Sequence, residues 1–257
     1  MIVFDKVSFS YAARSVLQEI SFSINAEEKL AILGGSGEGK TTLLKLILGL
    51  LRPDSGKIII DGEDITEKTE DDLREIRMQF SIVFQEGALF DSLSVKENVA
   101  FCLREYTSMS EKEIDQKVRD LLRKVGMEET IDLMPEELSG GMQRRVAIIR
   151  AMAAFEPKMF LYDEPTSGLD PVNADIIYRL ISELAGQGKG FVMVTHKVLD
   201  AVKMAERFIV LGKGRIIFDG DEEKLLRLPV PEIEVSVSEW RAGLQRSSLF
   251  SEEGKNV

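Results

Sequence analysis

The residues with the clearest chemistry form a glycine-rich segment near the N-terminus. Gly34 to Thr41 reads G-G-S-G-E-G-K-T and matches the pattern G-x-x-x-x-G-K-[ST]. It lies between a short apolar run and a predicted helix, so backbone N–H groups and a helix N-terminus can surround phosphate oxygens. Lys40 is then expected to reach the β- and γ-phosphates of a nucleotide, and the Thr41 hydroxyl to bind Mg²⁺. We expect the Glu38 side chain to point to solvent.

The alternative interpretation of this segment is a flexible glycine turn before an ordinary helix. A second motif, a pair of acidic residues, argues against that interpretation. Met159 to Tyr162 is an apolar strand that ends in Asp163 and Glu164. Beside a phosphate-binding loop, the first acid is placed to hold Mg²⁺ and the second to orient or deprotonate the attacking water. Alone, the two acids would simply cap the solvent-facing end of a strand.

The pattern of apolar residues predicts an α/β protein with a helical insertion. The first 35 residues read as short strands, the stretch from about Gln85 to Phe155 reads as mainly helical, and strands and helices alternate again after Pro157. Predicted strands are Lys57 to Ile60, Phe80 to Phe84, Met159 to Tyr162, Phe191 to Thr195, Arg207 to Leu211 and Arg215 to Phe218. Predicted helices are Thr41 to about Leu51, Glu111 to Lys124, one starting near Gly140, and Ala174 to Leu184.

Composition excludes several other kinds of chemistry. The 257 residues include 33 basic and 44 acidic ones, and the net charge of −11 disfavours nucleic acid as a partner. Cys102 is the single cysteine and His196 the single histidine, so an internal disulfide and a multi-histidine metal centre are excluded. The sequence has neither an apolar run of about 18 residues nor a signal-peptide pattern at its start. We therefore expect a cytoplasmic protein that reaches a membrane only through a protein partner.

A second glycine motif points to a family. Leu138 to Arg145, L-S-G-G-M-Q-R-R, resembles the signature of the ABC ATPases. The resemblance implies an α/β ABC ATPase fold, in which a P-loop NTPase core carries an antiparallel β subdomain and a helical insertion. It places the ABC ATPase domain at residues 1–228, with the helical subdomain at about 86–156, and leaves 229–257 as a C-terminal tail. It also implies a homodimer in which Ser139, Gly140, Gly141 and Met142 grip the γ-phosphate of ATP bound to the opposite subunit.

The resemblance extends to the other motifs of the family. Tyr11 matches the aromatic residue that stacks on adenine, Gln85 the glutamine that touches Mg²⁺ and water, and His196 the switch histidine at the γ-phosphate. The implied ATP-binding residues are Tyr11, Gly34, Gly35, Ser36, Gly37, Glu38, Gly39, Lys40, Thr41 and Thr42. The implied catalytic residues are Glu164, His196 and Gln85. The implied Mg²⁺ ligands are Thr41, Gln85 and Asp163. The implied interface loop is Ser167, Gly168, Leu169 and Asp170.

Each of these residues also has a purely structural interpretation. Tyr11 would be an ordinary strand tyrosine, Gln85 a loop residue, the interface loop a helix-capping turn, and His196 a structural histidine. The signature itself would be a serine N-cap with flexible glycines. The occurrence of all the motifs in the order of the family favours the functional interpretation of each one.

A finer resemblance concerns the transported substrate. Phe84 to Phe101 is similar to the ATPases of bacterial MCE/Mla phospholipid transport systems, and Met142 in the signature supports this. The resemblance implies that Leu89 and Phe90 dock a permease at the inner membrane; the alternative is that they only pack the insertion onto the core. An ABC importer or exporter for another solute, or a soluble ABC scaffold ATPase, remains an alternative. The stretch from Lys40 to Ser139 is too short for the coiled coils of chromosome-maintenance ATPases.

Overall fold

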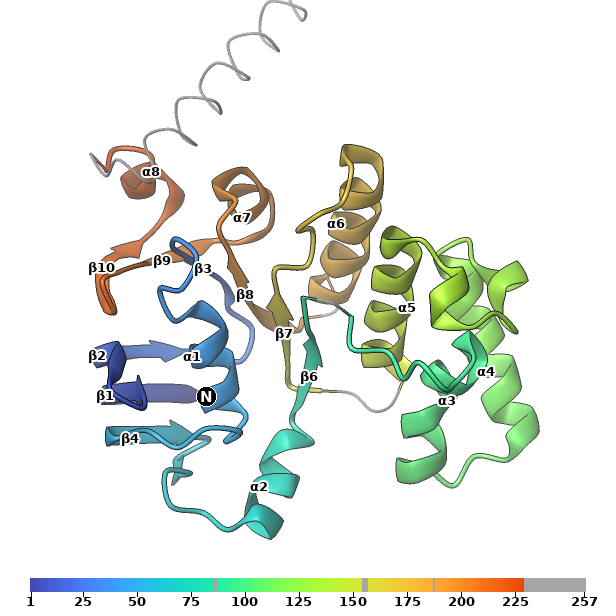
Figure 1. Ribbon diagram of the computed structural model, residues 1–257, viewed down its shortest axis with the longest axis horizontal. Coiled ribbons are helices and arrows are strands. Elements are labelled where there is room, and N and C mark those ends of the chain that lie inside the picture. Colours follow the sequence, from blue (N-terminus) through green and yellow to red (C-terminus); the bar gives the residue numbers. More distant parts are fainter. Residues whose placement is uncertain (86, 154–156, 187, 229–257) are drawn as a thin grey trace, which may run out of the picture.

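The chain folds around two β-sheets that lie on either side of the helix after the glycine-rich loop (Figure 1). The computed structural model describes residues 1–85, 87–153, 157–186 and 188–228. The smaller sheet is antiparallel, with strand order β2-β1-β4-β5. Its strands are β1 (Ile2–Tyr11), β2 (Arg14–Ile24), β4 (Ser55–Ile60) and β5 (Glu63–Asp64). Apolar residues alternate along β2, so one face of this sheet enters the core.

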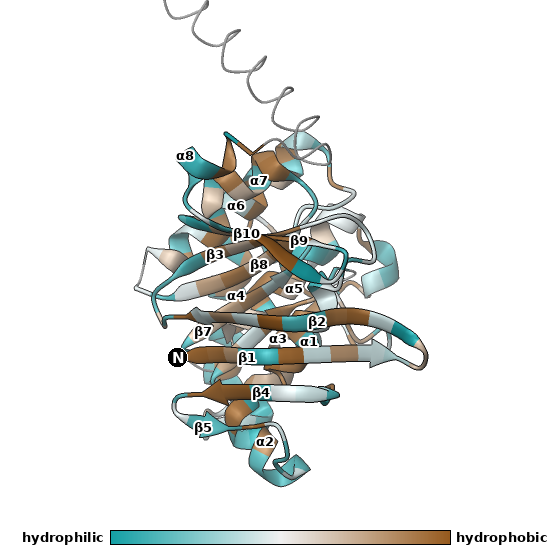
Figure 2. Ribbon diagram, turned by 90° about the vertical axis from the view of Figure 1, so that its left-hand side faces the viewer, coloured by the Kyte–Doolittle hydropathy of each residue, from teal (hydrophilic) through white to brown (hydrophobic). Residues whose placement is uncertain are grey.

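The larger sheet has six strands in the order β10-β9-β3-β8-β7-β6. Its strands are β3 (Lys29–Leu33), β6 (Phe80–Val83), β7 (Met159–Asp163), β8 (Gly190–Thr195), β9 (Arg207–Gly212) and β10 (Arg215–Gly220). All neighbours in it are parallel except β9 and β10. Every residue of β7 and β8 is buried, as expected for strands that are covered on both faces. In Figure 2 the strands carry long brown, apolar stretches, whereas β5 is teal.

Two hydrophobic cores lie on opposite faces of the larger sheet. Leu30 and Ile32 of β3 belong to the core shared with the smaller sheet and with α1 (Lys40–Ile47). Ala31 and Leu33 belong to the core shared with the helical insertion and with α6 (Pro171–Ala185). The remaining helices outside the insertion are α2 (Glu70–Arg77), α7 (Val198–Met204) and α8 (Glu222–Leu225).

The helical insertion follows β6 and returns to the sheet before β7 (Figure 1). It contains α3 (Val95–Tyr106), α4 (Glu111–Lys124), α5 (Gly140–Ala153) and the 3₁₀ turns η1 (Glu128–Thr130) and η2 (Pro135–Glu137). Capping boxes at Ser94 and Ser110 start α3 and α4. The predicted helix from Glu111 to Lys124 is confirmed, as is the helix starting at Gly140.

Some predicted boundaries were wrong. Helix α1 ends at Ile47 and not near Leu51, because Gly49 follows in the left-handed region with φ of 61° and lies against Leu73 of α2. Helix α6 begins at Pro171 and not at Ala174, since Asp170 caps it. The strand expected to reach Phe84 ends at Val83. Helix α2, capped by Thr69, was not predicted at all.

The helices and strands do not test the two predictions about domain boundaries. The division into an ATPase domain at 1–228 and a helical subdomain at about 86–156 remains a prediction. The predicted tail, 229–257, lies outside the described residues. Within the described part of the chain, no helix has the length and apolar character needed to cross a bilayer.

Candidate nucleotide-binding site

A cleft of about 1080 Å³ lies at the carboxyl ends of β3, β7 and β8. The structure brings together here most of the residues that the sequence predicted for nucleotide binding and catalysis. Its lining includes Tyr11, all of Gly34 to Thr42, Gln85, Glu164 and His196. Open α/β sheets bind their ligands at the carboxyl ends of parallel strands, which is where this cleft lies. The cleft is large enough for a nucleotide.

The glycine-rich loop is shaped by its close approach to the smaller sheet. Gly39 has φ of 94°, and a Cβ atom there would lie 2.7 Å from Cδ2 of Leu17 and 3.0 Å from Cγ1 of Val16. Gly39 is also the N-cap of α1, and it gives the first turn no side-chain cap. The N–H groups of this turn therefore remain available to an anion, as a phosphate cradle requires.

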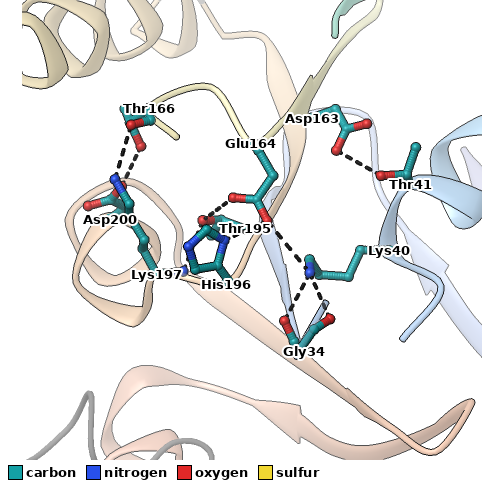
Figure 3. A network of polar contacts seen from close by, with 11 residues as sticks. Gly34, Lys40, Thr41, Asp163, Glu164, Thr166, Thr195, His196, Lys197 and Asp200 are labelled. Atoms are coloured by element: carbon teal, nitrogen blue, oxygen red, sulfur yellow. Dashed lines mark hydrogen bonds and ion pairs between the residues drawn. The ribbon is translucent and has the colours of Figure 1, made fainter. Parts of the chain in front are cut away.

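The Lys40 side chain is buried and folds back over the loop. Its Nζ donates to the carbonyl oxygens of Gly34 at 2.9 Å and Gly35 at 3.0 Å, and lies 3.6 Å from Oε1 of Glu164 (Figure 3). The ammonium group thus lies between the cradle and the acidic pair. This is the position from which a lysine can reach terminal phosphate oxygens.

Thr41 and Asp163 bring a hydroxyl and a carboxylate oxygen side by side. Thr41 Oγ1 donates to Asp163 Oδ1 at 3.0 Å across the gap between α1 and the end of β7 (Figure 3). Burial raises the pKa of the Asp163 carboxyl, the Thr41 hydrogen bond lowers it, and Glu164 raises it again. A hydroxyl and a carboxylate suit Mg²⁺, which takes one or two protein oxygens and completes its shell with water and phosphate. In the described part of the chain no three His, Cys, Asp or Glu side chains cluster as a metal cage.

Glu164 is held from two sides by the end of β8. Thr195 Oγ1 donates to its Oε2 at 3.1 Å, and Nδ1 of His196 lies 2.9 Å from its Oε1 (Figure 3). The carboxylate is buried, whereas His196 is exposed at the cleft. Glu164 also has φ of 48°, in the left-handed region that non-glycine residues rarely adopt.

The signature and the interface loop lie together, but neither lines this chain's own cleft. Ser139 is exposed and its Oγ accepts the N–H of Met142 at 3.4 Å at the start of α5. Asp170 Oδ1 caps α6 by accepting the N–H groups of Val172 at 3.0 Å and Asn173 at 3.1 Å. A Cβ atom on Gly141 would lie 2.8 Å from Cγ of Asn173. Asn173 therefore joins the signature helix to the loop that contains Ser167, Gly168, Leu169 and Asp170.

Several residues of the site were missed or misplaced by the sequence. Glu38 does not point freely to solvent: it is half-buried, and its Oε2 accepts the Gly214 N–H at 3.3 Å, because the β9–β10 turn lies over the loop. Arg14, Lys213 and Ile217 also line the cleft. Thr195, which contacts Glu164, was also not predicted, although its position directly before His196 could have indicated that it lies in the site. The sequence predicted both strands of the β9–β10 hairpin, but nothing in it indicated that their turn lies over the glycine-rich loop, since contacts between distant segments depend on the fold.

The comparisons with known proteins agree with this geometry. A family model described as ABC transporter matches residues 17–167. The intermembrane phospholipid transport system ATP-binding protein MlaF of Escherichia coli K12 is 39% identical over 228 residues, which cover 88% of this chain and 84% of the relative. The glutamine transport ATP-binding protein GlnQ of the same organism is 41% identical over 229 residues, which cover 89% and 95%.

A solved structure supports the same relationship. The dimeric post-hydrolysis state of an ATP-binding cassette bound to ADP and Pi has a TM-score of 0.80 and 32% identity, and the match covers 86% of this chain and 98% of that one. These matches confirm the predicted α/β ABC ATPase fold. The chain therefore belongs to the ABC transporter family, as an ATP-binding subunit whose ATP hydrolysis is coupled to transport.

Proposed function

We propose that this chain forms the homodimeric ATPase of a bacterial phospholipid transporter of the MCE/Mla type. The observation that carries the substrate class is the likeness to MlaF together with the Phe84–Phe101 segment and Met142 in the signature. The likeness to GlnQ is of equal extent, so a transporter of another solute is the alternative. The subunit would be cytoplasmic and would reach the inner membrane through a permease.

The proposed ATP site follows from the cleft. Tyr11, with 46% of its surface exposed at the cleft mouth, would stack on adenine, and the cradle with Lys40 would hold the phosphates. Thr41, Asp163 and the exposed Gln85 would hold Mg²⁺. When bound, Mg²⁺ neutralises charge on the β- and γ-phosphates.

Hydrolysis would depend on Glu164 and His196. The Glu164 carboxylate is fixed by the Thr195 hydroxyl and the His196 ring, so its orientation costs little at the moment of reaction. Glu164 would accept a proton from the attacking water, and His196 would contact the γ-phosphate from the cleft surface. The two residues immediately follow neighbouring parallel strands, which explains why they meet.

Completion of the site would require a second copy of the chain. Ser139 and Gly140 are exposed at the start of α5, away from this chain's own cleft. Backbone N–H groups at a helix start favour an anion, and this one has no anionic side chain in its first turn. The solved relative is a dimer bound to ADP and Pi. We infer that the signature of each subunit grips the γ-phosphate held by the other, with the Ser167–Asp170 loop at the interface.

The permease would dock on an aromatic surface of the insertion. Phe90 is 43% exposed, its ring centroid lies 4.9 Å from that of Phe101, and the Arg150 guanidinium carbon lies 5.6 Å from the Phe90 centroid. Leu89 is half-buried against the core. This surface therefore combines a partly buried residue, Leu89, with the exposed rings of Phe90 and Phe101, and such an apolar surface suits a partner helix. The partial burial of Leu89 also supports the packing alternative for that residue.

Reconstitution tests the substrate class. The chain would be expressed with the permease and any MCE-domain protein encoded beside it, and the complex placed in vesicles containing a fluorescent phospholipid. ATP-dependent lipid transfer that is lost in a Glu164→Gln complex supports the proposal. Neighbouring genes for a solute-binding protein, with ATPase stimulated by glutamine and no lipid transfer, would instead favour the importer.

A further inference from the structure

A buried polar cluster lies behind the catalytic residues, outside the cleft lining. Asp200 of α7 is 8% exposed and Thr166 is 1% exposed. Thr166 Oγ1 donates to Asp200 Oδ2, and Lys197 Nζ donates to the Thr166 carbonyl oxygen at 3.0 Å (Figure 3). Lys197 Nζ also lies 3.9 Å from Asp200 Oδ2. A carboxylate is buried in this way only when partners stabilise its charge.

Tyr178 of α6 completes the cluster. Burial raises the pKa of its hydroxyl, and the neighbouring Asp200 carboxylate raises it further, so the hydroxyl keeps its proton at neutral pH. Lys203 Nζ lies 5.1 Å from the centroid of the Tyr178 ring. Asp200 therefore has Thr166, Lys197 and Tyr178 around it, from three different segments of the chain.

The partners of Asp200 are next to the functional segments. Thr166 immediately precedes the Ser167–Asp170 loop, and Lys197 immediately follows His196. The backbone N–H of Lys197 also donates to Thr195 Oγ1 at 3.0 Å. The same Thr195 hydroxyl donates to Glu164. The loop after β7 and the segment after β8 are thus joined twice. One connection is the Glu164–His196 contact, and the other is the cluster around Asp200.

We propose that Asp200 is a positioning residue for ATP hydrolysis, which fixes the Ser167–Asp170 loop relative to His196 and Glu164 by holding Thr166 and Lys197. Asp200 touches neither the cleft nor the cradle, so it acts through these two residues. Removal of one partner from a buried charged cluster leaves the others unsatisfied and lets the segments shift. A shift of about 1 Å in a catalytic group can cost on the order of a hundredfold in rate. The proposal rests on the proposed roles of Glu164, His196 and the interface loop.

Steady-state kinetics of the full chain provide the first test. Asp200→Ala should lower kcat about tenfold or more, while KM and the Kd for ATP stay within about twofold, because the cradle does not contact Asp200. Asp200→Asn retains a carbonyl oxygen that can accept from Thr166 and should recover most of the rate. Asp175→Ala is the matched control, since Asp175 is an exposed carboxylate of α6 that pairs with Arg179 at 3.0 Å; it should behave like the parent.

Thr166→Val probes the same contact without removing a charge, and it keeps the test decisive if Asp200→Ala fails to fold. It should lower kcat with KM unchanged, and the double variant Thr166→Val/Asp200→Ala should be no slower than the slower single variant. The proposal is overturned if Thr166→Val and every folded Asp200 variant turn over ATP at the parent rate. It is also overturned if the loss appears in KM, or if Asp200→Asn loses rate and Tm together.

Dimerisation separates this proposal from the proposed function. In a Glu164→Gln background, ATP should drive the parent to a dimer in size-exclusion chromatography, and Asp200→Ala should raise the protein concentration needed for half dimerisation. A Glu164→Gln protein that stays monomeric at every concentration would contradict the sandwich itself. Parent and Asp200→Ala proteins that dimerise equally would contradict only the positioning of the interface loop by Asp200.

Discussion

Oε1 of Glu164 lies 2.9 Å from Nδ1 of His196, and the two residues immediately follow adjacent parallel strands of the larger sheet. The contact joins a buried carboxylate to an imidazole that is exposed at the cleft. The other oxygen of this carboxylate accepts a hydrogen bond from the Thr195 hydroxyl at 3.1 Å, which fixes its position. The proposed base is therefore oriented by residues of β8 and its following turn, and not by its own strand.

Replacement of Glu164 by Gln should lower kcat by roughly 10² or more, because the amide keeps the shape but cannot accept a proton from water. ATP binding should survive, since the cradle and Lys40 remain intact. Phosphate release and equilibrium ATP binding would be measured on the same preparation. Hydrolysis at the parent rate would show that Glu164 is not the base.

Ser139→Arg should bind ATP normally and fail to hydrolyse it, because the bulk and charge would occupy the place of the partner's γ-phosphate. Lys40→Ala should also fail to hydrolyse ATP, because it removes the lysine from the cradle of its own subunit. In a mixture of the two, one composite site carries both changes and the other carries neither, so part of the activity should return. Full activity of Ser139→Arg alone would refute the trans arrangement.

Phe90→Asp should leave folding and ATP affinity unchanged, since the residue is 43% exposed and does not line the cleft. The change should abolish co-purification with the permease and any stimulation of ATPase by it. Leu50→Asp, at another exposed apolar side chain, is the control and should retain the complex. Unfolding of Phe90→Asp would favour the core-packing alternative, and a retained complex would place docking elsewhere.

Asp115 gives a pH-dependent contribution to the stability of the insertion. It pairs with Lys96 of α3 and with Arg119 of α4 at 2.9 Å, and hydrogen bonds from these two residues hold the pKa of its carboxyl below the ordinary value. Because the folded pKa is lowered, the stabilisation is present above about pH 4 and is lost as the pH falls through the folded pKa. Asp115→Asn should lower Tm by roughly 1–2 °C at pH 7. The difference between the melting curves should shrink as the pH falls below 4 through the lowered pKa of Asp115, and a difference that stays constant over this range would contradict this account.

The sequence predicted the elements whose signals are local. The cradle, the acidic pair and the capping box before Glu111 each depend on residues next to one another, and all three lie where they were expected. The end of α1 was placed too late because Gly49, in the left-handed region with φ of 61°, stops the helix before Leu51. Helix α2 was missed although its capping box is local, because its charged first turn obscured the apolar stripe of Leu73 and Ile76.

Within the site, the sequence predicted only the residues that belong to motifs. Motif order indicated that Tyr11, Lys40, Gln85, Glu164 and His196 meet, and the cleft contains all five. The turn of Glu38 toward Gly214 and the cluster around Asp200 were not predictable. Both depend on how the β9–β10 turn and α7 pack against segments more than thirty residues away.

The close approach of Gly39 to Leu17 has a consequence for how variants of this protein would be classified. No space separates the phosphate loop from the core of the smaller sheet, because even a methyl group at Gly39 would overlap the Leu17 side chain. Leu17 is fully buried, so a larger or branched residue there would displace the loop before it disturbed the sheet. In a mutational scan, a core substitution at Leu17 would be scored as an ATP-affinity defect, although Leu17 does not line the cleft.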